Sequence, residues 1–107
     1  MYIVTNTVHV KEGFAEGFIE RFNKEGKIEF MDGFLGLEVM LTDHKADYEE
    51  ITISTRWETK DNFKGWMTSD AFKSAHAHRG GLPDFMIKNK TSMYEVKVVR
   101  QPMTVSK

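Results

Sequence analysis

Alternating apolar and polar residues predict strands in four parts of the chain. Residues 2–10 and 48–57 alternate most regularly, and residues 35–41 and 91–99 form further runs rich in apolar or β-branched side chains. Because alternate residues of a strand point to the same face, each regular run has one face that suits a core. These faces consist of Tyr2, Val4, Asn6, Val8 and Val10 in the first run and Ile51, Ile53, Thr55 and Trp57 in the second.

The spacing becomes helical between these strands. Apolar residues recur at intervals of three or four from Gly13 onward, which predicts an amphipathic helix that ends near Gly26. They are Phe14, Ala15, Phe18, Ile19 and Phe22. A second helical pattern follows Thr59, a candidate N-cap, and carries Phe63, Trp66 and Met67.

This second helical pattern is expected to break after Met67. Thr68, Ser69 and Asp70 are typical of a helix N-cap, so a separate short helix is predicted to follow them. It carries Phe72, Ala75 and His76. A pair of glycines and a proline then end that helix and open a loop to about Asn89.

The order of elements is therefore β-α-β-β-α-β within one domain, residues 1–107, which is the α+β arrangement of the ferredoxin-like fold. Helices would cover one face of an antiparallel sheet and leave the other face to be covered by something else. Apolar candidates for that second face are Leu35, Leu37, Val39, Met93 and Val99. If the open faces of two such sheets pack together, they form a dimeric α+β barrel. We therefore predict that the protein is a homodimer.

Composition narrows the possible partners and compartments. The formal net charge is -1, so the chain lacks the excess of positive charge that favours nucleic acid or anionic membranes. Cysteine is absent, which excludes disulfides, thiolate metal sites and a cysteine nucleophile. The first ten residues contain no basic leader, and no apolar run reaches the roughly 18 residues that span a bilayer. We therefore expect a cytoplasmic protein.

His76 is the first candidate for chemistry, because it shares the apolar face of its helix with Phe72. A histidine at a helix end is more often a surface residue favoured by the helix dipole, and that interpretation stays open. The alternative is a neutral imidazole that binds a metal or a haem iron. The spacing of His76 and His78 matches no zinc motif, whereas one axial ligand suffices for haem because the porphyrin supplies four nitrogens.

Trp66 and Asn6 each have a structural and a functional interpretation. Trp66 is a core residue by default, and it can share a cavity with His76 only if the helix breaks between them, since positions ten apart differ by roughly 280° around a continuous helix. Asn6 is the one amide on an otherwise apolar strand face. It either bonds a nearby backbone group or donates a hydrogen bond to a ligand between sheet and helices.

Together these residues resemble a known family. Asn6 in the first strand, Trp66 in "FKGWMTSDAFKSAHAH" and His76 ten residues later are similar to the Isd-type haem-degrading monooxygenases. These belong to the antibiotic-biosynthesis-monooxygenase-like superfamily of dimeric α+β barrels. The segments "IERF", "GFLGLEV" and "ITISTRWETKDNFKGW" also look like their family counterparts, so the resemblance covers nearly the whole chain.

The resemblance implies that haem is both substrate and cofactor, and that dioxygen and an external electron donor, a reductase, take part. His76 would be the axial ligand of the haem iron, Asn6 would donate a hydrogen bond on the opposite side, and Trp66 would press on the porphyrin and ruffle it. Further apolar walls would be Phe22, Phe63, Met67 and Phe72. The products would be iron and a linear tetrapyrrole.

Two alternatives stay open at this point. One keeps the fold and replaces haem with a small aromatic substrate, as in the cofactor-independent quinol monooxygenases of the same superfamily. That reaction does not need Asn6, Trp66 and His76 together, which counts against it. The other is a protein that binds or buffers haem without degrading it.

Overall fold

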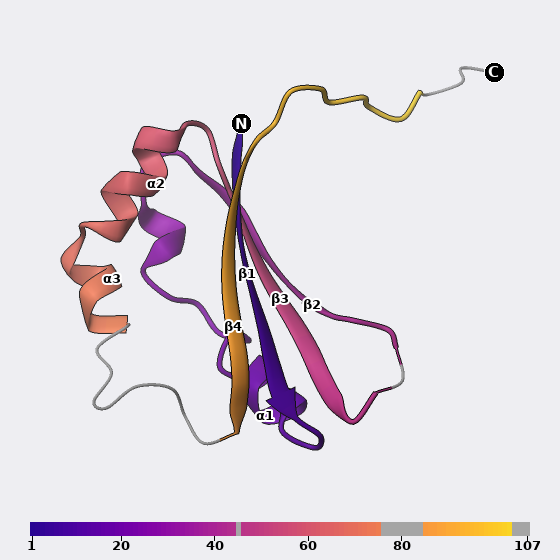
Figure 1. The fold of residues 1–107 in the computed structure, drawn as a ribbon. Coiled ribbons are helices and arrows are strands. Elements are labelled where there is room, and N and C mark those ends of the chain that lie inside the picture. The colour runs from indigo at the N-terminus through magenta and orange to yellow at the C-terminus, as the bar shows by residue number, and fades with distance from the viewer. Residues whose placement is uncertain (45, 76–84, 104–107) are drawn as a thin grey trace.

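Four strands form one antiparallel sheet in the order β2-β3-β1-β4 in the computed structural model, which describes residues 1–44, 46–75 and 85–103 (Figure 1). The strands are β1 (Tyr2–Lys11), β2 (Phe34–Leu41), β3 (Tyr48–Trp57) and β4 (Met86–Glu95). All three strand pairs are antiparallel, with β1 and β3 in the centre. This arrangement confirms the predicted ferredoxin-like α+β fold.

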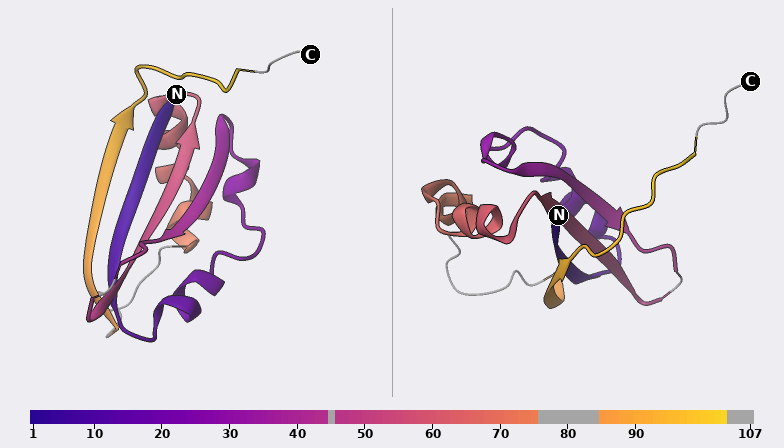
Figure 2. Two further views of the ribbon diagram at one scale, coloured as in Figure 1. Left: turned by 90° about the vertical axis from the view of Figure 1, so that its right-hand side faces the viewer. Right: turned by 90° about the horizontal axis from the view of Figure 1, so that it is seen from above.

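The helices lie on one side of this sheet (Figure 2). They are α1 (Ala15–Glu20), the short 3-10 helix η1 (Ile28–Phe30), α2 (Lys60–Met67) and α3 (Asp70–Ala75). Within the described ranges, none of these helices has the length and apolar character needed to cross a membrane.

The register of β1 decides which residues face the helices. Asn6 lies opposite Ile53 of β3 and opposite Thr91 of β4, and directly opposed residues point to the same face. The helix-facing residues of β1 other than Asn6 are all buried, and so are Ile51, Ile53 and Trp57 of β3. The predicted core faces of both strands are therefore confirmed.

Two predicted boundaries were wrong. The first helix ends at Glu20 and not near Gly26, because only Ala15 and Phe18 of α1 are buried and residues 21–27 are almost entirely polar and exposed. The fourth strand spans Met86–Glu95 and not residues 91–99, and it replaces the end of the loop predicted to reach Asn89. Its position follows β1, because β4 can extend only as far as β1 offers backbone groups to pair with.

The predicted second face of the sheet was wrong for three of its five residues, and a fourth, Val99, lies beyond the end of β4. Leu37 and Val39 pack against the core on the helix side, and Met93 points to that side too because it lies opposite Val4. The face turned away from the helices is largely polar. Its charged residues include the ion pair of Arg56 with Glu38, the pair of His9 with Glu50, and Lys88 and Lys90 of β4.

Ser69 explains why α2 and α3 are separate helices. Its hydroxyl accepts a hydrogen bond from the backbone N–H of Phe72 at 3.1 Å, as an N-cap does, and donates to the carbonyl of Trp66 at 2.6 Å. Thr59 caps α2 in the same way by accepting from Asn62 N–H at 3.2 Å. Both predicted N-caps are thus confirmed, and with them the break after Met67.

Replacing Ser69 with alanine should destabilise the protein, because the first turn of α3 loses its cap. We expect Ser69→Ala to lower the free energy of unfolding by about 0.5 to 2 kcal/mol, as measured by urea denaturation. Thr68→Ala is the matched control, since the Thr68 hydroxyl donates only to carbonyls of α2 and should change stability by at most about 0.5 kcal/mol. Equal losses in the two variants would contradict the assignment of Ser69 as the cap.

Glu50 should make stability depend on acidity. Its pKa lies below the ordinary value of 4.5 because the Thr42 hydroxyl donates to it at 2.7 Å and His9 contacts it at 2.8 Å. A lowered carboxyl pKa stabilises the fold fully above 4.5, and this contribution is lost as the pH falls toward the pKa of the folded state. We expect Glu50→Gln to flatten the acid side of a stability-against-pH curve. Glu20→Gln, at an exposed position, should leave the curve unchanged, and a wild-type slope in Glu50→Gln would refute the assignment.

Candidate functional site

Asn6 is the polar centre of the site. Its Oδ1 atom is buried and has no hydrogen-bond partner among the described residues. Leaving a buried polar atom unpaired costs about 1 to 3 kcal/mol, and such groups in native proteins usually have a function or a missing partner. The expectation that Asn6 bonds a nearby backbone group is therefore not met for Oδ1, which leaves the ligand interpretation in place.

Asn6 separates two apolar clusters on the helix side of the sheet. The first cluster packs α1 against the lower half of the sheet and consists of Val8, Val10, Ala15, Phe18, Ile51 and Ile53. The second packs α2 against the upper half and consists of Tyr2, Val4, Trp57, Phe63 and Trp66. The amide thus lies where neither helix layer continues the core across the sheet.

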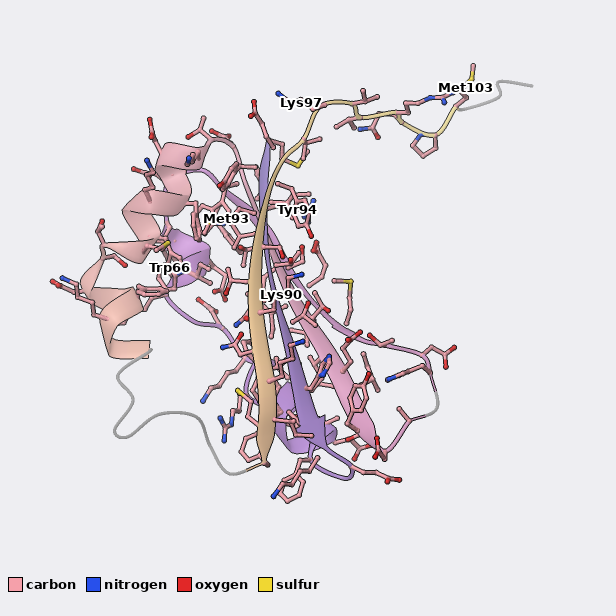
Figure 3. The ribbon with its side chains drawn as sticks, viewed as in Figure 1. Trp66, Lys90, Met93, Tyr94, Lys97 and Met103 are labelled. Carbon is pink, nitrogen blue, oxygen red and sulfur yellow. The ribbon has the colours of Figure 1, made fainter. Side chains whose placement is uncertain are left out.

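Trp66 belongs to the second cluster, which also contains Val4, the helix-facing residue of β1 that precedes Asn6. It is only 9% exposed, and its side chain lies between α2 and the sheet (Figure 3). The ring of Phe72 meets the indole edge-on at 5.6 Å with an interplanar angle of 85°. Residues six apart on one continuous helix differ by about 240° around the axis, so this contact exists only because the chain breaks at Ser69.

The other predicted apolar walls differ in where they lie. Phe63 is buried in the core, with its ring 6.1 Å from that of Tyr2 and 6.0 Å from that of Trp57. Phe22 follows α1, packs on Phe18 at 5.5 Å and is 36% exposed, while Met67 is 40% exposed. Phe63 is therefore part of the core around Tyr2 and Trp57, whereas contacts of Phe22 and Met67 with a ligand stay predictions.

His76 and His78 lie outside the described residues, so the axial-ligand role of His76 stays a prediction. Helix α3 is described to Ala75 and carries the chain up to His76. Among the described residues, no three histidine, aspartate or glutamate side chains gather in a way that could hold a metal ion. Two hollows of about 370 and 380 Å³ are lined by described residues, and neither includes Asn6 or Trp66.

The helix-facing side of β4 belongs to the site and was missed by sequence reasoning. Thr91 lies opposite Asn6 and Met93 opposite Val4, so both point to the side that holds the helices, yet both are exposed. Figure 3 shows where Met93 lies on β4. The strand was recognised there, but only its pairing with β1 shows which of its residues flank Asn6. The described helices thus leave an open strip of sheet beside the amide.

These residues suit a flat, mostly apolar ligand that needs one polar contact. Trp66 and Phe72 offer an aromatic wall, the open strip of β4 offers a floor, and Asn6 offers a neutral amide with an unsatisfied buried atom. Large ligands are typically held by apolar walls with a few placed polar groups. A porphyrin has these properties, so the residues present fit haem as a substrate.

Comparison with known proteins agrees with the geometry. Residues 1–78 match the model of the family "Antibiotic biosynthesis monooxygenase". A protein of Bacillus mycoides named "Heme-degrading monooxygenase" is 57% identical over 106 residues, which are 99% of each chain. A relative with the same name from Bacillus anthracis is 56% identical over the same share of both chains.

Solved structures confirm the fold. A Bacillus cereus protein described as an antibiotic biosynthesis monooxygenase has a TM-score of 0.85 at 33% identity, covering 94% of this chain and 97% of that one. The Mycobacterium tuberculosis heme-degrader MhuD, with two hemes bound in its active site, has a TM-score of 0.72 at 22% identity, covering 94% and 100%. The chain therefore belongs to the antibiotic biosynthesis monooxygenase family, and within it to the group of haem-degrading monooxygenases.

Proposed function

We propose that this protein binds haem as its substrate and opens the porphyrin ring, using dioxygen and electrons from an external reductase, with release of iron and a linear tetrapyrrole. The observation that carries the proposal is the half-buried Asn6 amide, which no described residue engages, on the same face of the sheet as the cluster that contains Trp66. The near full-length similarity to proteins named as heme-degrading monooxygenases supports the same reaction class.

Each residue has a distinct task in this proposal. His76 binds the iron from one side through a neutral imidazole nitrogen. Asn6 donates from Nδ2 to an acceptor on the other side of the ring, where a neutral donor stabilises developing negative charge and a carboxylate would repel it. Trp66 presses against the porphyrin, and distortion of the macrocycle is one way in which a protein changes haem reactivity.

The burial of Trp66 supports its mechanical role. A side chain that packs among Tyr2, Val4 and Phe72 cannot move aside when a ligand presses on it, because protein cores are packed as densely as organic crystals. The ligand therefore adapts to the indole more than the indole adapts to the ligand. Haem itself supplies the iron at which dioxygen chemistry occurs.

Mixing the purified protein with haem and then adding ascorbate or a reductase in air tests this function. We expect a shifted Soret band at one equivalent of haem, followed by loss of the band and release of iron. A stable Soret band that survives reductant would instead identify a haem-buffering protein. The absence of any Soret shift would refute both and favour a cofactor-independent oxygenase.

Three single variants test the residue roles. His76→Ala should lose the spectrum of the axially ligated haem, and an unchanged spectrum with full activity would move the assignment to His78. Asn6→Ala and Trp66→Ala should still bind haem but degrade it at least about 100-fold more slowly, as expected for loss of a group that acts in the transition state. Wild-type turnover in either variant would remove that residue from the mechanism.

We also propose that the protein is a homodimer in which the polar faces of two sheets meet. That face is not covered by the helices, and Met40 and Tyr94 on it are 46% and 52% exposed, so a second copy of the sheet would bury apolar surface there. Residues 96–103 lead away from α2 and α3 (Figures 1 and 2). Their apolar side chains are exposed, with Val98 at 75%, Val99 at 56% and Met103 at 92%.

Sedimentation tests the dimer. At micromolar concentration we expect twice the chain mass of 12.4 kDa, and we expect a chain ending at Lys97 to dissociate at least about tenfold more readily because it lacks the exposed apolar segment. A chain ending at Met103 is the control and should behave as the full chain does. A full-length monomer at this concentration would contradict the proposal.

A further inference from the structure

The inner oxygen of the Asn6 amide needs a partner. Two buried side-chain atoms lack a hydrogen bond within the described ranges, Asn6 Oδ1 and Arg56 Nε, but Arg56 Nε lies 2.8 Å from Glu38 Oε1 in an ion pair. Asn6 Oδ1 therefore stands apart as a buried acceptor with no nearby compensation. A porphyrin face offers no N–H or O–H donor to it, so a ligand bound there would not remove the deficit.

Cross-strand register restricts the possible donors. The residues directly opposite Asn6 are Ile53, which has no polar group, and Thr91, which has a hydroxyl. Directly opposed side chains have their Cβ atoms about 4.5 to 5.5 Å apart on the same face, which is within reach of a side-chain hydrogen bond.

The other hydroxyl near this row is already engaged. Thr55 lies opposite Val4, and its Oγ1 accepts from Trp57 Nε1 at 3.0 Å and donates to the carbonyl of Val4 at 3.4 Å. The Thr91 hydroxyl, by contrast, makes no hydrogen bond to any other described residue, and its side chain is exposed on the edge strand. Rotation of an exposed threonine between staggered conformers meets little resistance from packing.

We propose that Thr91 is a positioning residue for Asn6, whose hydroxyl donates a hydrogen bond to Oδ1 and so directs Nδ2 toward the ligand. An amide group can turn by 180° and present either its oxygen or its nitrogen. With Oδ1 bound to Thr91, the N–H donors face the helix side. Without that bond, the oxygen would face the ligand part of the time and would repel an acceptor there.

The proposed hydrogen bond needs only rotation of the Thr91 side chain and no ligand, so only its effect on turnover rests on the proposed function. In the haem-free protein, the side-chain amide signals of Asn6, identified by their loss in Asn6→Ala, report the bond in NMR spectra. We expect Thr91→Val to shift these signals and the Asn6 Cγ resonance, because valine keeps the shape and strand preference but lacks the hydroxyl. Thr91→Ser should restore the wild-type positions.

Ser92→Ala is the matched control for these spectra, since Ser92 is the next residue of β4 and points to the opposite face of the sheet. It should leave the Asn6 signals in place. If the Asn6 signals of Thr91→Val coincide with those of the wild type, or if Ser92→Ala shifts them equally, the positioning role is refuted whatever the protein does with haem.

Haem titration and turnover separate positioning from a general structural role. We expect Thr91→Val to bind haem within about twofold of the wild type and to degrade it roughly fivefold more slowly, which corresponds to the loss of one net hydrogen bond. Thr91→Ser should recover most of the rate. A loss of haem affinity without a change in rate would overturn the proposal. A wild-type protein that does not bind haem would refute the proposed function, while the NMR result would still decide the contact between Thr91 and Asn6.

Discussion

The pairing of β1 with strands on both of its sides is the constraint on which the rest of the structure depends. β1 is held by β3 on one edge and β4 on the other, so its register is fixed along the whole strand. A slip of one residue would turn Val4, Val8 and Val10 away from the helices, and it would also turn Asn6 away from the site. The same backbone contacts that stabilise the core therefore decide where the amide points.

The placement of Asn6 has an energetic cost that the surrounding core can bear. A buried amide oxygen in the middle of the sheet weakens the fold unless a group such as the Thr91 hydroxyl pairs with it, but it lies between two clusters that are each complete without it. Fully buried residues on both sides of Asn6 supply the stabilisation, with Val8 and Ile51 in the next row on one side and Trp57 two rows away on the other. Functional sites commonly break a local rule in this way while the surrounding structure compensates for it.

Much of this arrangement was predictable from the sequence, because the spacing of apolar residues and the helix-capping residues are local signals. Alternation identified β1 and β3 and their core faces, and the polar residues at Thr68 to Asp70 identified the break between α2 and α3. The failures concern long-range pairing. The limits of β4 and the direction of Met93 follow from β1, some 85 residues earlier in the chain, and no local pattern encodes them. For the same reason Thr91 was not recognised as the neighbour of Asn6.

The break at Ser69 connects stability with the proposed chemistry. A continuous helix through residues 60–75 would bury one apolar stripe and would point Phe72 away from Trp66. With the break, the Ser69 hydroxyl pairs groups at both helix ends, and Phe72 turns back onto the indole at 5.6 Å. Trp66 is thereby fixed from the sheet side by Tyr2 and Val4 and from the helix side by Phe72. Trp66 and Phe72 are therefore ordered before any ligand binds. Because ligand binding does not have to order these side chains, the binding energy remains available to distort the ligand.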